Sequence, residues 1–168
     1  KDWSYAVNFN VAYVKNEITD MRGTEGVDPD NSKFWRLEGH PIGTFYGYVA
    51  DGLFKTQADL DNHPKRTGKE KLGDIKYKDL NGDGKITAAD RDVIGKNFPT
   101  WTGGLNVAVY YKDFDFSMLW QGAFDVDAYY TGEAAYAFFN SGKVLTKHMD
   151  RFHEVNNPEG NFPRVSLK

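Results

Sequence analysis

The sequence predicts an all-β protein that forms part of an antiparallel transmembrane β-barrel. Apolar and polar residues alternate with a period of two over residues 3–13, 101–111 and 114–124, which is typical of strands with one apolar face. Each run is as long as a membrane strand of about 9–11 residues. A two-residue turn joins two of the runs and the other connections are long and irregular, which is how outer-membrane barrels are built.

Composition excludes several classes of protein. The net charge of -3 and the lack of any Lys/Arg run argue against a nucleic-acid partner. The chain has no cysteine, so disulfides and thiolate metal sites are excluded. No run approaches ~18 apolar residues, so a transmembrane helix is not expected. The mean hydropathy of -0.64 is compatible with a β-barrel, whose strands alternate and whose loops are polar.

The first strand is expected over residues 3–13. Its odd positions are aromatic or aliphatic and its even positions are small or polar. Trp3 and Tyr13 stand at its ends, where a membrane strand carries interfacial aromatic residues. The chain starts inside this pattern and ends without punctuation at "NFPRVSLK", so we expect it to be a piece of a longer chain.

The segment between the first and second long strands is expected to be mixed. Residues 22–33 are rich in Gly, Pro, Asp and Asn and predict a loop. Residues 34–54 predict one or two strands, broken near Pro41 because proline cannot donate to a ladder. Residues 55–98 are expected to form an extracellular loop, with a short helix at "TQADLDNH". One or two helical turns are expected from Thr87, with Asp90 reaching back to the cap and Gly95 ending the helix.

A β-hairpin is expected over residues 101–124. Its two strands each have one apolar face and are joined by a turn at Lys112 and Asp113. If this turn is periplasmic, the loops 55–98 and 125–160 lie outside the cell. Strict alternation of strands then places residues 22–33 on the periplasmic side, although that segment is long for a periplasmic turn.

The stretch "DLNGDGKITAAD" has the spacing of an EF-hand calcium loop. Such a loop uses side-chain oxygens at positions 1, 3 and 5, a carbonyl at 7, a water-mediated contact at 9 and a carboxylate at 12, with glycine at 6. Gly84 occupies position 6, and Ile86 would attach the loop to apolar neighbours. The alternative is a plain turn, because Asn-Gly is a strong turn signal. The predicted calcium ligands are Asp79, Asn81, Asp83, Lys85, Thr87 and Asp90, the last standing where glutamate is usual.

Other candidate sites have weaker support from the sequence. The loop 125–160 contains aromatic residues that could stack on a sugar, although such residues more often pack a long loop onto its neighbours. These candidates are Tyr129, Tyr130, Tyr136, Phe138 and Phe139. The histidines do not form an HExxH spacing, and no GxSxG or Walker A pattern occurs. The sequence therefore predicts no enzymatic activity.

Five blocks of the chain, in this order, resemble the C-terminal β-barrel portion of SusC/RagA-type TonB-dependent outer-membrane transporters. The most specific blocks are "GTFYGYVADGLF" and "GDIKYKDLNGDGKI". The others are "FNVAYVKNEITDM", "FPTWTGGLNVAVYYKDFDFSMLWQGAF" and "NFPRVSL". The resemblance covers nearly all of residues 1–168.

The resemblance implies a location in the outer membrane of a gram-negative bacterium and a barrel of about 22 strands. It implies import of oligosaccharides or peptides into the periplasm, an N-terminal plug coupled to TonB, and a SusD-like surface lipoprotein as a lid. The chain contains neither plug nor TonB box, so by itself it would be wall and loops. The main alternative is a soluble, secreted, calcium-stabilised β-sandwich that binds glycans and buries the same apolar faces against a second sheet. A secreted glycoside hydrolase fragment lacks a supporting carboxylate pair.

Overall fold

The computed structural model describes residues 2–28 and 31–165. Residues 29 and 30 of the predicted loop 22–33, and the last three residues of "NFPRVSLK", lie outside the described residues. The chain divides into two compact units. The first consists of the residues up to Phe45 together with Gly95–Ala128, and the second of Tyr46–Ile94 together with the residues from Tyr129 onward.

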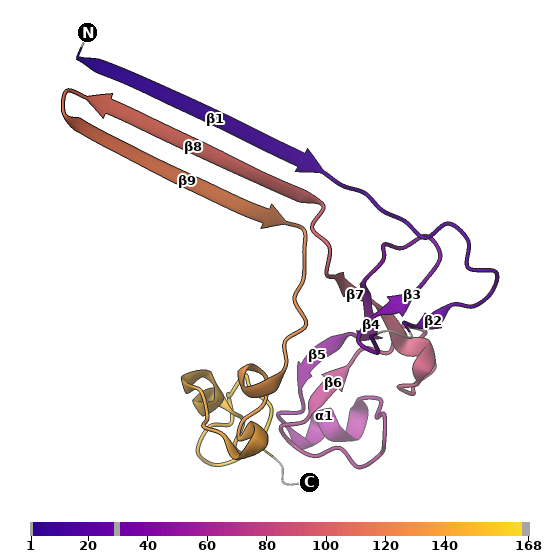
Figure 1. The fold of residues 1–168 in the computed structure, drawn as a ribbon. Helices are drawn as coiled ribbons and strands as arrows, with labels where there is room; N and C mark the ends of the chain where they lie inside the picture. The colour runs from indigo at the N-terminus through magenta and orange to yellow at the C-terminus, as the bar shows by residue number, and fades with distance from the viewer. Residues whose placement is uncertain (1, 29–30, 166–168) are drawn as a thin grey trace. The chain divides into compact units, whose positions relative to one another are not determined.

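Three long antiparallel strands form the main sheet of the first unit (Figure 1). They are β1 (Trp3–Tyr13), β8 (Trp101–Tyr111) and β9 (Phe114–Phe124), in the order β1-β8-β9. The bounds are those that the hydrophobic alternation predicts, and Lys112 in the connecting turn has the positive φ of 51° that a tight hairpin turn favours. The sheet is open, because β1 and β9 each have one edge without a partner strand among the described residues.

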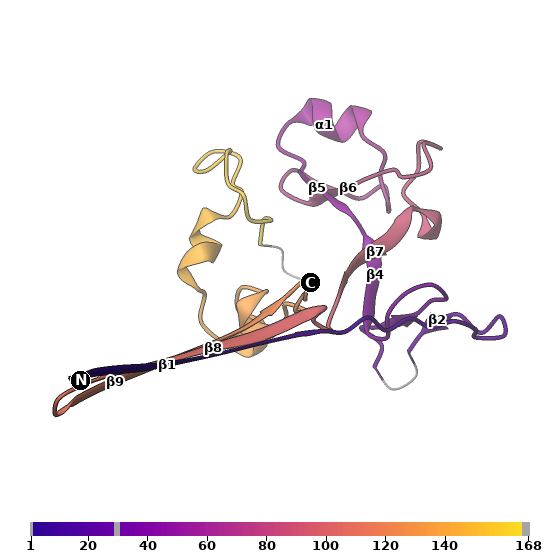
Figure 2. The ribbon, with the colours of Figure 1, turned by 90° about the horizontal axis from the view of Figure 1, so that it is seen from above.

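The register brings the apolar side chains of all three strands to one face. The two-residue turn shifts the pairing by one position, so even positions of β9 align with odd positions of β8 and β1. Figure 2 shows the three strands nearly edge-on as a single layer. The apolar rows across the sheet are Trp3–Tyr111–Phe114, Tyr5–Val109–Phe116, Val7–Val107–Met118, Phe9–Leu105–Trp120 and Tyr13–Trp101–Phe124.

The pairing of β1 with β8 corrects one expectation. Tyr13 lies opposite Trp101, so the chain leaves the sheet and returns to it at the same end. The described residues between these two positions add no strand to this sheet. Residues 22–33 therefore belong to the connection at that end and do not form a turn at the opposite, Lys112 end, as alternation had suggested. The physical reason is that residues 34–54 form only short strands, too short to cross back along the sheet.

The connection contains two small sheets. One has the order β2 (Gly26–Val27), β3 (Trp35–Arg36), β4 (Thr44–Tyr48) and β7 (Arg91–Lys96); the other pairs β5 (Ala50–Leu53) with β6 (Ile75–Tyr77). Pro41 lies between β3 and β4, where the sequence predicted a break. The boundary between the two units falls within β4 and β7. In the second unit the buried apolar side chains are those of Leu53, Phe54, Leu60, Ile86 and Phe152.

The helices are short. Helix α1 (Gln57–Asn62) is the one expected in the loop, and Thr56 and Asp59 form a capping box at its start. The expected helix after Thr87 is shorter than predicted: η1 (Ala88–Asp90) is a single 3₁₀ turn, after which β7 pairs with β4 and the backbone becomes extended.

The loop after β9 contains three more 3₁₀ segments. They are η2 (Gly132–Ala134), η3 (Phe139–Ser141) and η4 (Thr146–Asp150). Within the described ranges, no helix has the length and apolarity needed to cross a membrane.

Candidate functional site

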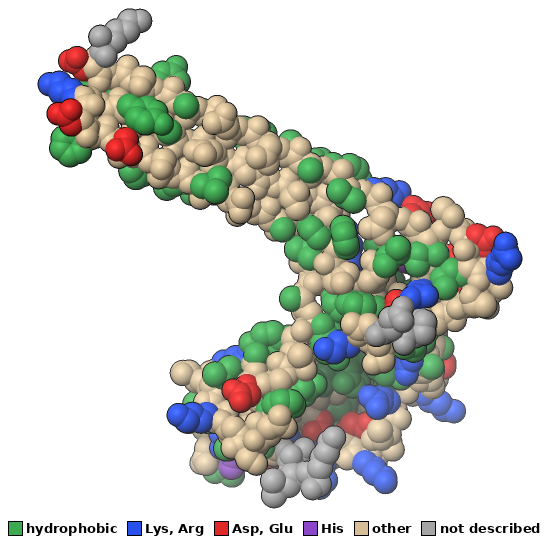
Figure 3. Space-filling view, in the orientation of Figure 1, with side chains coloured by type: hydrophobic (Ala, Val, Ile, Leu, Met, Phe, Trp, Pro, Cys, Tyr) green, Lys and Arg blue, Asp and Glu red, His purple; other side chains and the backbone are tan. Residues whose placement is uncertain are grey.

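The main sheet of the first unit has one face of exposed apolar side chains. Tyr5, Phe9 and Phe114 on this face are 80%, 72% and 78% exposed. The three strands carry a single charged residue, Asp115, which lies beside the turn. In the view of Figure 3 the charged side chains gather at the ends of this sheet and its middle carries none. A sandwich would bury these side chains against a second sheet, and here they are exposed.

Aromatic residues mark both ends of this apolar face. Trp3 stacks on Tyr111 at the turn end with ring centroids 4.1 Å apart, and Tyr13 meets Trp101 at the other end with centroids 4.6 Å apart. Ten residue steps at about 3.3 Å each separate Trp3 from Tyr13, or about 33 Å along the strand. A barrel strand tilted by about 40° therefore spans about 25 Å across a membrane, which is the height of the apolar band of an outer-membrane barrel.

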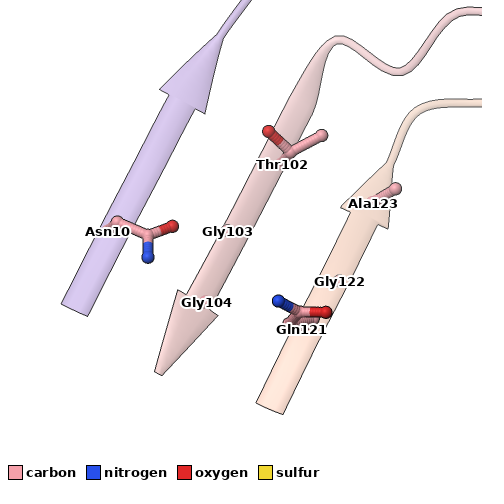
Figure 4. Close-up of a pocket in the computed structure, with 7 residues that line it drawn as sticks. All are labelled: Asn10, Thr102, Gly103, Gly104, Gln121, Gly122 and Ala123. Carbon is pink, nitrogen blue, oxygen red and sulfur yellow. The ribbon is translucent and has the colours of Figure 1, made fainter. Parts of the chain in front are cut away.

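The opposite face of the sheet is polar and carries no charge over most of its length. Asn10 lies opposite Gly104, and Gly104 lies opposite Gln121, so that two amide side chains flank a position without a side chain. A shallow hollow of about 500 Å³ lies at these residues, and Thr102 and Ala123 also line it. Figure 4 shows the residues that line it. Asn10 comes within 3.2 Å of where a Cβ on Gly104 would stand. This face can offer hydrogen bonds to a neutral polar partner or to water.

The predicted calcium loop is held together by its own side chains. The two carboxylate oxygens of Asp79 accept the N–H groups of Gly82 (2.7 Å) and Gly84 (2.8 Å). Asn81 Oδ1 accepts the N–H of Asp83 (2.9 Å), and Asp83 Oδ1 accepts the N–H of Lys85 (2.8 Å). Each carboxylate or amide oxygen can accept about two hydrogen bonds, so these oxygens keep acceptor capacity for a cation.

Asp90, the predicted closing ligand, is fully buried and its oxygens are already used. Oδ1 accepts the N–H groups of Leu80 (3.0 Å) and Asn81 (3.4 Å), and Oδ2 accepts the N–H of Thr87 (2.7 Å) and its hydroxyl (3.3 Å). The Thr87 N–H is the main cause that holds the pKa of Asp90 below its usual value. Ile86 is buried, as expected.

The six predicted ligands therefore fit a calcium ion unevenly. The side chains of the first three predicted ligands, Asp79, Asn81 and Asp83, can still accept a cation. Asp90 would have to release a backbone donor to bind a metal. No group of three or more acidic or histidine side chains in the described part of the chain is close enough to hold a metal ion. Calcium binding stays a prediction.

The aromatic residues of the last loop are exposed but do not form one platform. Lys147 Nζ donates a hydrogen bond to the Tyr130 hydroxyl and lies 3.9 Å from the ring centre of Tyr130. Tyr136 and Phe139 stack on each other with centroids 6.4 Å apart. Phe138 is exposed at a positive φ of 58°, a conformation rare for a bulky residue. Tyr129 is also exposed. Sugar stacking by these five residues stays a prediction.

One structural feature was missed by sequence reasoning. Arg164 forms a two-pronged ion pair with Asp74, with distances of 2.7 and 3.3 Å, and its N–H donates to the carbonyl of Gly73. A Cβ on Gly73 would stand 2.6 Å from the Phe152 ring. Both partners lie in quoted blocks, "GDIKYK" and "NFPRVSL", but nothing in the sequence indicates that these blocks meet.

Comparison with known proteins finds no matching family model. Curated relatives include TonB-dependent receptor P3 of Formosa agariphila, 28% identical over 73% of this chain, and receptor P26 of the same organism, 29% identical over 90%. TonB-dependent receptor SusC of Bacteroides thetaiotaomicron is 25% identical over 77% of the chain. The matched regions are only 13%, 16% and 13% of these relatives, so the chain spans a small part of their length.

A solved structure has the same fold. It is described as the structure of the RagAB peptide transporter, and it matches 98% of this chain with a TM-score of 0.64 at 16% sequence identity. The match covers 18% of that chain. These relatives are receptors and a transporter, and none is an enzyme.

Proposed function

We propose a role in outer-membrane uptake for this chain, which is a portion of a SusC/RagA-type TonB-dependent receptor. The main sheet would be barrel wall in the outer membrane of a gram-negative bacterium, and the long connections would be its outer loops. The observation that carries the proposal is the exposed apolar face, whose aromatic rows lie about 33 Å apart along the strand. Exposed apolar surface of this extent is costly in water and favourable in lipid.

In this role the two faces of the sheet do different work. The apolar rows, from odd positions of β1 and β8 and even positions of β9, contact lipid. The amide-rich face around Asn10 and Gln121 lines the lumen. Directed import would come from a plug and its TonB partner, which are outside this chain, and a SusD-like lipoprotein would close the barrel from outside. The substrate class is an oligosaccharide or a peptide; the solved relative is described as a peptide transporter.

Cell fractionation tests the proposal. A blot with an antibody against residues 79–90 should give a band in the detergent-extracted outer membrane that is several times heavier than 19.1 kDa. A soluble band near 19.1 kDa would instead support the secreted sandwich.

The topology can be tested in the same cells. A cysteine introduced at Thr24 or Asp83 should react with a bulky, impermeant maleimide on intact cells. A cysteine at Asp113 should react only after the outer membrane is opened. The reverse pattern would invert the assigned orientation.

We also propose that the loop 79–90 binds calcium when the receptor is at the cell surface. Asp79, Asn81 and Asp83 would supply side-chain oxygens, Lys85 its carbonyl and Thr87 a water-mediated contact, which is the ligand set of an EF-hand loop. Asp90 would close the shell if one of its oxygens exchanged a backbone donor for the ion. The ion would act as a fixed positive charge that stiffens an exposed loop.

Calorimetry on the purified full-length receptor tests the calcium site. Asp83→Asn should remove the calcium-dependent heat and the calcium-dependent protection of the loop against protease. Asp92→Asn, outside the loop, is the control and should change neither. Equal heats for wild type and Asp83→Asn would show that the loop is a metal-independent turn.

A further inference from the structure

The second unit contains a cavity that none of the predicted sites includes. Its volume is about 370 Å³. One wall comes from the segment that leads into β6 and the other from the segment near the end of the chain, about 90 residues later. The residues that line it are Arg66, Thr67, Lys69, Glu70, Asp74, Ile75, Tyr77, Pro163 and Arg164.

Two of the charged residues in this cavity, Asp74 and Arg164, connect its two walls. Asp74 and Arg164 bind each other through two contacts of 2.7 and 3.3 Å, and the N–H of Arg164 donates to the Gly73 carbonyl at 2.9 Å. Their charges cancel, and Asp74 Oδ2 also accepts the N–H of Lys71 at 2.9 Å. They join the two walls and leave the other charged groups to a ligand.

Glu70 is the residue whose bonding is incomplete. Its Oε1 accepts the N–H of Thr67 at 2.7 Å and the Thr67 hydroxyl at 2.9 Å. Its Oε2 is buried and has no hydrogen-bond partner among the described residues. Burial is the largest single influence and raises the pKa of Glu70, but hydrogen bonds from the N–H and hydroxyl of Thr67 and from the N–H groups of Glu70 and Gly68 together hold the pKa below the usual value. A buried, ionised oxygen without a donor is costly, so a donor from outside these residues is expected.

Two cations accompany Glu70 in the cavity. Arg66 and Lys69 line the same space, and the guanidinium of Arg66 is held over the ring of Tyr48, 5.3 Å from its centre. With Asp74 and Arg164 neutralising each other, two positive charges face one negative charge. The cavity therefore carries a net charge of +1 and needs one hydrogen-bond donor.

We propose that this cavity binds an acidic fragment of a substrate, in which a carboxylate or sulfate lies beside a hydroxyl or amino group. The hydroxyl or amino group donates to Glu70 Oε2, and the anion contacts Arg66 and Lys69. This assignment rests on the proposed uptake function and specifies one part of it. An acidic oligosaccharide and an acidic peptide share the required chemistry.

Binding to the purified full-length receptor, measured by calorimetry, tests the assignment. The probes are trigalacturonate and triglutamate, with maltotriose as the neutral comparison. Both the anion and the donor are expected to matter, so at least one acidic probe should bind and maltotriose should not. The affinity of the acidic probe should fall as the salt concentration rises, because Arg66 and Lys69 are near the surface.

The variant Glu70→Gln distinguishes the role of Glu70 in ligand binding from its role in holding the local fold. A glutamine can keep the two bonds from Thr67 while replacing the Oε2 acceptor with a donor. Binding of the acidic probe should weaken about tenfold to a hundredfold, the loss expected for a hydrogen bond to a charged group. Lys69→Gln should also weaken it. The controls Glu159→Gln and Lys65→Gln alter residues that do not line the cavity, and they should leave the affinity unchanged.

Three results would overturn the assignment. Failure of both acidic probes to bind the wild-type receptor, or binding that Glu70→Gln leaves intact, would overturn the assignment and leave Glu70 Oε2 to an ordered water. Binding of maltotriose alone would also overturn it. None of these results would contradict the proposed uptake function if cell fractionation still finds the receptor in the outer membrane. A soluble protein in the fractionation would contradict the uptake function itself.

Discussion

Replacing Gly73 with alanine should loosen the attachment of Arg164 to the start of β6 far more than the same change at Gly68. Both glycines have a positive φ, 85° at Gly73 and 72° at Gly68. They differ in their surroundings. A Cβ at Gly73 would stand 2.6 Å from the Phe152 ring and 2.9 Å from the Arg164 Cβ, whereas a Cβ at Gly68 would meet no atom within 4 Å.

The magnitude follows from two separate costs. An L-residue in the left-handed region costs about 1–2 kcal/mol, and both variants carry this cost. Extra atoms forced into a packed site cost about 1–3 kcal/mol more, and only Gly73→Ala carries this second cost because Phe152 is buried there. The difference of about 1–3 kcal/mol corresponds to roughly 5-fold to 150-fold in an opening equilibrium.

Amide hydrogen exchange on the full-length receptor measures this opening. The Arg164 N–H, which donates to the Gly73 carbonyl, and the Phe152 N–H, which donates to the Phe162 carbonyl, are the reporters. Their exchange should be accelerated by Gly73→Ala and should be little changed by Gly68→Ala. Equal acceleration by both variants would refute the reasoning, since it would mean that only backbone conformation matters and that the close approach to Phe152 does not.

Two further predictions concern other parts of the chain. Val107→Arg, in the middle of the apolar face, should destabilise the receptor in liposomes by about 2–4 kcal/mol, while Asn106→Arg on the polar face should cost far less; similar urea midpoints for the two would contradict the assignment of the faces. The order of the loop around Asp90 should be lost on acidification, because hydrogen bonds from Thr87, Leu80 and Asn81 lower the pKa of Asp90. A carboxyl with a lowered pKa stabilises the folded loop above about pH 4 and loses that contribution as the pH falls through the lower folded value. The protection of the Leu80 N–H, measured as its exchange rate relative to the intrinsic rate at each pH, should therefore fall only under acid conditions, and Asp90→Asn should remove this dependence on pH; constant protection over the same pH range in the unmodified receptor would argue against it.

Local patterns in the sequence were sufficient for the long strands. Alternation with period two fixes which side chains share a face, because successive side chains of a strand point in opposite directions. It predicted the bounds of β1, β8 and β9 and the turn at Lys112. The Thr87–Asp90 capping box was also predicted, because it joins residues only three positions apart.

Partners distant in the chain were decided by tertiary structure. Period-two alternation does not say which strand lies beside which, so the pairing of β1 with β8, and with it the place of residues 22–33, came only from the fold. The extended backbone from Arg91 onward likewise depends on β4, which overrides the helical tendency of the sequence after Thr87.

The loop 79–90 and the cavity at Glu70, both in the second unit, also differ in what the sequence reveals and what only the structure reveals. The calcium-type spacing of residues 79–90 is visible in the sequence because its ligands are local. The burial of Asp90 is visible only in the structure, and it shows that this residue is already bonded within the loop. The cavity at Glu70 was invisible in the sequence, because its walls come from segments about 90 residues apart that the Asp74–Arg164 pair brings together. The sequence alone thus determined strands, faces and local loops, whose causes lie within a few residues, and the tertiary structure decided every contact that depends on which distant segments meet.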